Sequence, residues 1–265
     1  EPYRRQRQMC IRDRSENVKG EIEFDHVSFA YPEAGENVLT DISFKAKKGQ
    51  TIAVIGSTGS GKSTLINLIP RYYDVTKGSV KVDGVDVRDM TQKELRDKLG
   101  YVPQKGVLFS GTIDSNIRYG KPEITDAQVK EAAEVAQATE FIDTKPEKYE
   151  SPVSQGGTNV SGGQKQRLSI ARAIAKDPEI FIFDDSFSAL DFKTDSQLRK
   201  ALKEYTKDAT TVIVAQRIST ILGADQIIVL DDGHMAGIGT HKELMANCEV
   251  YQQIARSQLS EEELA

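Results

Sequence analysis

The sequence predicts an α/β fold with a mainly parallel central sheet, an N-terminal antiparallel β subdomain and an inserted helical subdomain. Residues 51–55 and 180–183 are continuously apolar, as expected of strands buried on both faces of a parallel sheet. Segments with the apolar spacing of helices alternate with these runs, which is the order of a βαβ architecture. Residues 113–176 show helical patterns throughout, so we expect them to form the inserted subdomain.

Taken in chain order, the elements start with two alternating segments, residues 20–29 and 38–45, which predict paired antiparallel strands. After the strand at 51–55, Leu65, Ile66, Leu68 and Ile69 have helical spacing, and residues 79–87 predict a hairpin that turns at Asp83-Gly84. Residues 126–139 and the apolar stripe 168–175 predict helices. Strands are expected at 180–183, 211–215 and 226–230, and Asp231-Asp232-Gly233 predicts a last hairpin.

Composition excludes several classes of protein. The 265 residues include 38% hydrophobic and 28% charged residues, as in ordinary globular proteins, and the formal net charge of −5 disfavours nucleic acid as a partner. Cys10 and Cys248 are the two cysteines, and their separation predicts neither a disulfide framework nor a zinc site. No apolar run reaches the roughly 18–20 residues of a membrane-spanning helix.

A glycine-rich loop follows the strand at 51–55 directly. Glycines at 56, 59 and 61 allow consecutive backbone N–H groups to surround phosphate oxygens, Lys62 supplies a charge for the β- and γ-phosphates, and the Ser63 hydroxyl suits Mg²⁺. The order of strand, loop and helix is the one that a phosphate-binding loop requires, so the sequence predicts a P-loop ATPase core that binds ATP and Mg²⁺. The residues expected to contact nucleotide here are Gly56, Ser57, Thr58, Gly59, Ser60, Gly61, Lys62, Ser63 and Thr64.

Three further strings narrow the class of ATPase. Ser161-Gly162-Gly163-Gln164 precedes a long amphipathic pattern, the strand at 180–183 ends in Asp184, and Ser188-Ala189-Leu190-Asp191 follows shortly after. Together with the loop at 56–63, these strings resemble the nucleotide-binding domains of ABC transporters from about residue 20 to residue 251. The run 108–117, which reads LFSGTIDSNI, resembles the exporter branch of that family, of the multidrug and lipid type.

The resemblance implies a role for each matching position. Tyr31 matches the aromatic residue that stacks on adenine, with a core tyrosine as the alternative, and Asp184 and Gln104 match residues at the Mg²⁺ ion, Gln104 also touching the attacking water. In the family, two domains pair head to tail, so Ser161, Gly162, Gly163 and Gln164 would cap the ATP of the partner, and Asp191 matches a loop at the same interface.

Two positions depart from the family pattern. The general base that follows Asp184 is normally glutamate, and this chain has Asp185, which withdraws the carboxylate by roughly 1–1.5 Å. The family usually has histidine where this chain has Gln216, and glutamine cannot take up a positive charge. With these two departures the chain resembles the degenerate-site subunit of a heterodimeric exporter. We therefore expect slow ATP hydrolysis at its own catalytic residues, Asp185, Gln216 and Gln104.

The resemblance also implies the surroundings of the chain. We expect a second ABC ATPase domain, from a different chain with intact glutamate and histidine, and a six-helix transmembrane domain fused upstream, at the cytoplasmic face of the plasma (inner) membrane. A fully active homodimer and a stand-alone importer ATPase are the alternatives, and a soluble ABC ATPase acting on DNA ends or ribosomes is disfavoured because coiled coils, a second ATPase domain and a basic face are missing.

Three segments are expected along the chain. Residues 1–18 carry Arg4, Arg5 and Arg7 among other arginines without an apolar period, and we expect a terminal extension that is disordered or non-native. The ABC ATPase domain is expected to span residues 19–255, with its helical subdomain at about 113–176. Residues 256–265 are expected to form an acidic tail.

Overall fold

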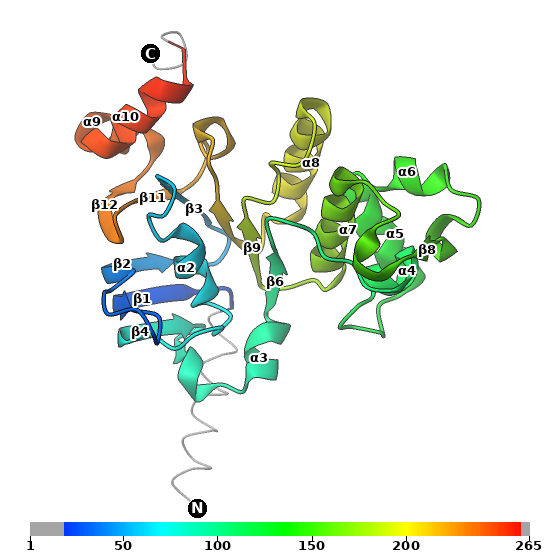
Figure 1. Ribbon diagram of the computed structural model, residues 1–265, viewed down its shortest axis with the longest axis horizontal. Helices are drawn as coiled ribbons and strands as arrows, with labels where there is room; N and C mark the ends of the chain where they lie inside the picture. Colours follow the sequence, from blue (N-terminus) through cyan, green and yellow to red (C-terminus); the bar gives the residue numbers. More distant parts are fainter. Residues whose placement is uncertain (1–18, 261–265) are drawn as a thin grey trace, which may run out of the picture. The chain divides into compact units, whose positions relative to one another are not determined.

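The computed structural model describes residues 19–260 and divides into two compact units. One unit comprises residues 100–208, and the other comprises the described residues before and after it (Figure 1). The expectation for residues 1–18 lies outside the described residues, as do positions 261–265 of the expected tail. Among residues 19–260, no helix has the length and apolar character needed to span a membrane.

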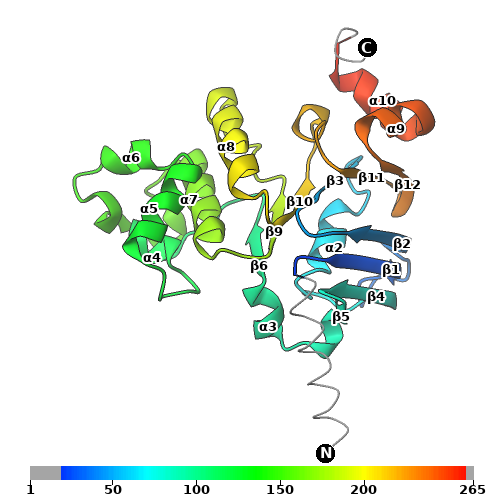
Figure 2. The ribbon, with the colours of Figure 1, turned by 180° about the vertical axis from the view of Figure 1, so that it is seen from behind.

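The first unit contains an antiparallel sheet with the order β2-β1-β4-β5. Phe24 pairs with Phe44 on one side and with Val80 on the other, and the Phe24 and Phe44 rings pack edge to face at 4.7 Å. β2, β1 and β4 lie side by side in both views (Figures 1 and 2). Their bounds are β1 Ile22–Phe29, β2 Leu39–Ala46, β4 Lys77–Val82 and β5 Val85–Asp86. The predicted antiparallel β subdomain is therefore confirmed, with its hairpin turning at Asp83-Gly84.

Parallel strands form the second layer of this unit. β3 (Thr51–Gly56) lies between β10 (Thr210–Val214) and β11 (Gln226–Asp231), and both neighbours run parallel to it. β12 (His234–Gly239) returns antiparallel to β11 through a turn in which Asp232 and Gly233 have φ values of 45° and 75°. The parallel arrangement agrees with the apolar runs, because Val54 and Ile55 point to opposite faces of the sheet and both are buried.

Short helices complete the first unit. They are α2 Lys62–Asn67, η1 Val87–Asp89, α3 Gln92–Asp97, η4 Ile218–Thr220, α9 His241–Asn247 and α10 Glu249–Gln258. α10 buries Tyr251 and Ala255 in the same core as Ile227 and Val229, and Leu259 after it is also buried. The chain is thus helical and packed beyond residue 256, where we expect the acidic tail to begin, because the apolar positions of α10 continue the helical period past that point.

The second unit is mostly helical. Its helices are α4 Ile113–Ile117, α5 Asp126–Val135, α6 Thr139–Asp143, η2 Lys148–Glu150, η3 Gln155–Gly157, α7 Gly162–Ala175 and α8 Phe192–Tyr205. Its strands are β6 Leu99–Val102, β7 Gly111–Thr112, β8 Pro152–Val153 and β9 Ile180–Asp184, with β6 beside β9. α7 packs against α4 and α5 (Figures 1 and 2). The predicted α/β fold with an added helical region is confirmed, and the helical unit described here also includes β6, β9 and α8.

A partly buried arginine joins α7 to the loop before β7. Arg172 donates to the Val107 carbonyl at 2.9 Å and, at 2.8 and 2.9 Å, to the carbonyl and side-chain oxygen of Asn116. Its guanidinium also lies 5.2 Å from the ring centroid of Phe109 and 5.6 Å from that of Tyr119. Burial lowers the pKa of Arg172 to about 10, so the group remains cationic at neutral pH.

Substituting Arg172 by lysine is expected to destabilise the chain by about 1–2 kcal/mol, because an ammonium lacks the planar fork that reaches three oxygens. The midpoint of thermal unfolding should fall by about 3–6 °C. Arg199→Lys is the matched control, since Arg199 on α8 makes a partly exposed ion pair with Asp195 and should shift the midpoint little. Equal shifts for both variants would contradict the structural role assigned to Arg172.

Candidate nucleotide-binding site

The loop between β3 and α2 has a backbone that glycine alone accommodates easily. Gly59 and Gly61 have φ values of 81° and 100°, in the left-handed region. A Cβ added to Gly56 would lie 2.3 Å from the Leu230 carbonyl oxygen, and one added to Gly61 would lie 2.8 Å from the Leu39 side chain. The loop is therefore shaped by close packing against its own unit, and this leaves Ser57, Thr58 and Gly59 exposed.

Lys62 folds back over this loop. Its Nζ donates to the carbonyl oxygens of Gly56 and Ser57, at 2.8 Å each. Ser63 is exposed, and Thr64 is buried on the first turn of α2. A lysine ammonium beside a loop with left-handed glycines is the kind of chemistry that binds a polyphosphate, and so the loop fits a nucleoside triphosphate.

Tyr31 lies beside the same loop. Its hydroxyl and the Thr64 hydroxyl are 2.8 Å apart in a hydrogen bond, and its side chain is partly exposed. The Tyr31 ring packs edge to face against Phe29 at 4.9 Å and against Tyr73 at 5.2 Å. Tyr31 is thus neither fully buried nor free, and it is placed next to α2 as a stacking platform would need to be.

Acidic side chains stand at the end of β9 in the second unit. The Asp184 carboxylate accepts from the Tyr101 hydroxyl at 3.5 Å, and the Asp185 carboxylate accepts from Gln104 Nε2 at 3.2 Å. Asp185 has a φ of 47°, a left-handed conformation that aspartate tolerates better than most residues. The structure therefore brings two sequence-predicted residues, Gln104 and Asp185, into direct contact. The side-chain oxygens of Asp184 and Gln104 are of the hard type that Mg²⁺ prefers.

The Ser161–Gln164 string forms the start of α7. Ser161 is the N-cap: its hydroxyl accepts from Gln164 N at 3.2 Å, and the Gln164 side chain accepts from Ser161 N at 3.2 Å. This reciprocal pair is a capping box, which the spacing of serine and glutamine could have indicated. A Cβ at Gly162 would meet no atom within 4 Å, so the helix start presents its backbone without crowding.

The remaining candidates are distributed between the units. Gln216 follows β10 in the first unit, is exposed, and its backbone carbonyl accepts from Gln258 Nε2 at 2.8 Å. Asp191 is the N-cap of α8 in the second unit, and hydrogen bonds from the Thr194 backbone and side chain lower its pKa. The first unit thus holds Tyr31, the loop 56–64 and Gln216, and the second holds Gln104, Ser161–Gln164, Asp184, Asp185 and Asp191.

Sequence comparison assigns this arrangement to a family. A family model described as ABC transporter matches residues 39–188, which is more than half of the chain and includes the glycine-rich loop, Gln104, the SGGQ string and Asp185. The chain belongs to the ABC transporter family. The resemblance deduced from its motifs is thereby confirmed, and nucleotide binding is the property that this family assignment implies for the loop.

Relatives of this ABC transporter chain are considerably longer. A Bacillus subtilis protein named as a multidrug export ATP-binding/permease protein is 47% identical over 232 residues, covering 88% of this chain and 40% of the relative. A Staphylococcus aureus protein of the same designation is 47% identical over 236 residues, covering 89% of this chain and 41% of the relative. This chain therefore spans about two fifths of their length.

A solved structure gives the same result for the fold. A bacterial Atm1-family ABC exporter with ATP bound aligns with a TM-score of 0.87 at 38% sequence identity. The alignment covers 92% of this chain and 43% of that exporter chain. The α/β ATPase fold of the ABC transporter family is therefore shared across nearly all of the present chain.

Three contacts within the site were not evident from the sequence. Tyr101, which donates to Asp184, and Tyr73, which packs on Tyr31, lie in segments without a periodic pattern. The sequence offered an indirect signal for Tyr101, its position within Tyr101-Val102-Pro103-Gln104, and offered none for Tyr73. The pairing of Tyr31 with Thr64 also joins residues 33 positions apart, which pattern analysis does not detect.

Proposed function

We propose that this chain is the ATP-binding domain of a membrane ABC exporter and binds ATP with Mg²⁺ at the loop 56–64. The loop N–H groups and Lys62 would hold the triphosphate, and Tyr31 would stack on adenine. Ser63, Asp184 and Gln104 are the residues that would hold Mg²⁺, which when bound offsets the charge of the phosphates. The left-handed glycines and the position of the Lys62 Nζ support this proposal.

The observation that carries the finer proposal is Asp185 at the position of the general base. Its carboxylate is one methylene shorter than that of glutamate and accepts from Gln104, and a misplacement near 1 Å can lower a rate by about a hundredfold. Gln216, which cannot become positively charged, occupies the position usual for histidine. We infer that the site retains ATP and hydrolyses it slowly.

The intact SGGQ string fits a role toward a partner. In a head-to-tail pair, the exposed start of α7 with its Ser161 hydroxyl would face the ATP held by a second ATPase domain, where faster hydrolysis would occur. We infer that this second domain belongs to a different chain with glutamate and histidine at the matching positions. A six-helix transmembrane domain would complete the exporter, and the ATPase domain would lie at the cytoplasmic face of the plasma membrane. The exporter would move drugs, lipids or other amphipathic substrates. The names of the relatives support export.

The proposal is tested by incubating the chain with radiolabelled ATP and Mg²⁺, separating bound from free nucleotide and quenching with acid at intervals. The bound nucleotide should be recovered as ATP, with turnover below about 0.1 s⁻¹, a hundredfold under a typical enzyme rate. Failure to bind ATP would exclude the proposed nucleotide site. Rapid appearance of ADP would exclude the proposal that this site hydrolyses ATP slowly.

A further inference from the structure

Three aromatic rings form a cluster at the edge of the proposed nucleotide site. Phe29, at the end of β1, is buried, whereas Tyr73, after α2, is 41% exposed. Ring centroids are 4.9 Å apart for Phe29 and Tyr31, 5.2 Å for Tyr31 and Tyr73, and 5.6 Å for Phe29 and Tyr73. The Tyr31 ring therefore has edge-to-face neighbours, with interplanar angles of 80° to Phe29 and 89° to Tyr73, which is a favourable aromatic geometry.

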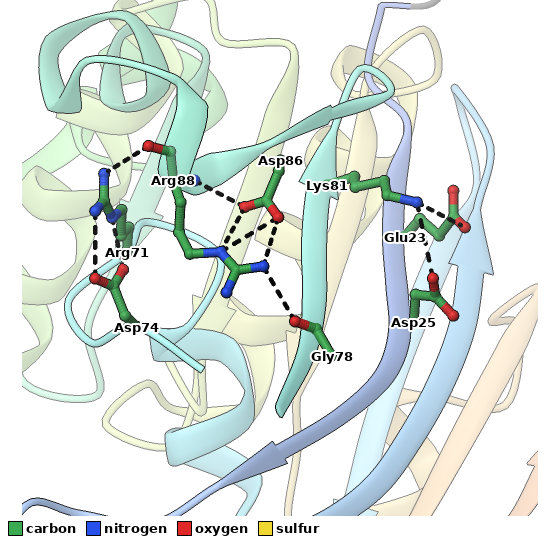
Figure 3. A network of polar contacts seen from close by, with 8 residues as sticks. All are labelled: Glu23, Asp25, Arg71, Asp74, Gly78, Lys81, Asp86 and Arg88. Carbon is green, nitrogen blue, oxygen red and sulfur yellow. Dashed lines mark hydrogen bonds and ion pairs between the residues drawn. The ribbon is translucent and has the colours of Figure 1, made fainter. Parts of the chain in front are cut away.

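The segment that carries Tyr73 is fixed by an ion pair at its ends. Arg71 Nε and one terminal nitrogen donate to the two carboxylate oxygens of Asp74, at 2.6 and 3.2 Å (Figure 3). This ion pair joins the residues on either side of Tyr72 and Tyr73 in the sequence. The side-chain hydrogen bond from Arg71 lowers the pKa of Asp74. Arg71 itself has a φ of 56°, a backbone conformation that positions the turn.

A second arginine, Arg88, connects the Arg71–Asp74 ion pair to the antiparallel sheet. Arg71 donates to the Arg88 carbonyl at 3.4 Å, and the Arg88 side chain donates to the Asp86 carboxylate at 2.7 Å and to the Gly78 carbonyl at 3.1 Å (Figure 3). Gly78 lies on β4 and Asp86 on β5. The turn that carries Tyr73 is thus connected through Arg88 to β4 and β5.

The hydroxyl end of the Tyr31 side chain is held by α2, the helix that follows the glycine-rich loop. Its hydroxyl pairs with Thr64 at 2.8 Å, and the N–H of the preceding Ala30 donates to the Thr76 hydroxyl at 3.0 Å. The hydroxyl contact fixes the tip of the side chain but leaves rotation of the ring about its long axis to the neighbouring rings. Since Phe29 is part of the core, Tyr73 is the exposed neighbour that can be changed without emptying the core.

We propose that Tyr73 is a positioning residue that orients the Tyr31 ring for stacking on the nucleotide base. This inference rests on the proposed function, because it assumes that Tyr31 contacts the base. A ring that is already oriented loses less freedom when a base stacks on it, which strengthens binding without any direct contact between Tyr73 and the nucleotide. The effect depends on the base and leaves the interaction of the loop with phosphate unchanged.

The test compares ATP with inorganic tripolyphosphate, each with Mg²⁺, by calorimetric titration of the 265-residue chain. Tyr73→Leu is expected to weaken ATP binding about fivefold, the value of an aromatic pair, and to leave tripolyphosphate affinity unchanged. Tyr73→Phe keeps the ring and should bind ATP like the unsubstituted chain. Tyr72→Leu is the matched control, since Tyr72 is similarly exposed and its ring lies under the Arg96 guanidinium, and it should leave both affinities unchanged.

The outcomes separate this inference from the proposed function. If Tyr73→Leu binds ATP as tightly as the unsubstituted chain, or weakens both ligands equally, Tyr73 does not position the base platform although the nucleotide site stands. If the unsubstituted chain binds neither ATP nor tripolyphosphate, the proposed function fails and the inference with it. A loss confined to ATP, with rescue by phenylalanine, is the result that supports the positioning role.

Discussion

Replacing Lys62 by alanine is expected to weaken Mg²⁺-ATP binding by at least about a hundredfold, because charge-assisted hydrogen bonds to phosphate are lost together with a full positive charge. The substitution also removes the bonds from Nζ to the Gly56 and Ser57 carbonyls, which hold the loop in its present shape. Equilibrium dialysis or calorimetry with ATP and Mg²⁺ would measure the change.

Lys48→Ala provides the matched control for this prediction. Lys48 is an exposed lysine in the turn before β3, so its loss changes the net charge of the chain equally without altering the loop. ATP affinity should stay within about twofold, since a screened surface charge contributes little. A Lys62→Ala chain that keeps its thermal midpoint and binds ATP within threefold of the unsubstituted chain would show that the loop does not hold the triphosphate.

The glycine-rich loop could be predicted because its determinants are local. A buried strand, three glycines at fixed spacing and a following helix are all visible within residues 51–69. The same holds for β9 and its terminal Asp184, since an uninterrupted apolar run ends in an acid. These features depend on backbone conformation and burial over a few residues, which sequence patterns report directly.

The aromatic cluster and Arg172 could not be predicted for the opposite reason. Tyr31, Thr64 and Tyr73 come from three segments, and their contacts depend on how the sheet and α2 pack. Arg172 interrupts an apolar helical stripe, and an arginine at such a position is ordinarily expected at the surface. Its partial burial is explained by oxygens of Val107 and Asn116 and by the rings of Phe109 and Tyr119, all far away in the sequence.

Near residue 255, the amino-acid composition and the spacing of apolar residues predict different structures. Charged and polar residues after position 255 favour a solvated tail, yet Tyr251, Ala255 and Leu259 recur every four residues and are all buried. The apolar period prevails because one face of α10 suffices to bury these side chains against Ile227 and Val229.

Restoring both family residues in one chain, Asp185→Glu with Gln216→His, is expected to raise ATP hydrolysis by about a hundredfold or more. The longer side chain advances the carboxylate toward the position of a general base, and imidazole regains a group able to carry positive charge. Since the SGGQ string is intact, two copies of the substituted chain would form two complete sites when they pair head to tail. Phosphate release at saturating Mg²⁺-ATP, measured over a range of chain concentrations, would report the gain and its dependence on pairing.

A chemically identical pair of substitutions away from the site, Asp97→Glu with Gln92→His, controls for nonspecific effects because both residues are exposed on α3. Glutamate fits the left-handed backbone at position 185, where φ is 47°, less well than aspartate does, so a modest fall in thermal midpoint should accompany the gain in rate. The two effects have opposite signs and cannot be mistaken for each other. Unchanged hydrolysis in a folded, ATP-binding Asp185→Glu/Gln216→His chain would mean that these two residues are not what limits the rate, and the proposal of a degenerate site would have to be abandoned.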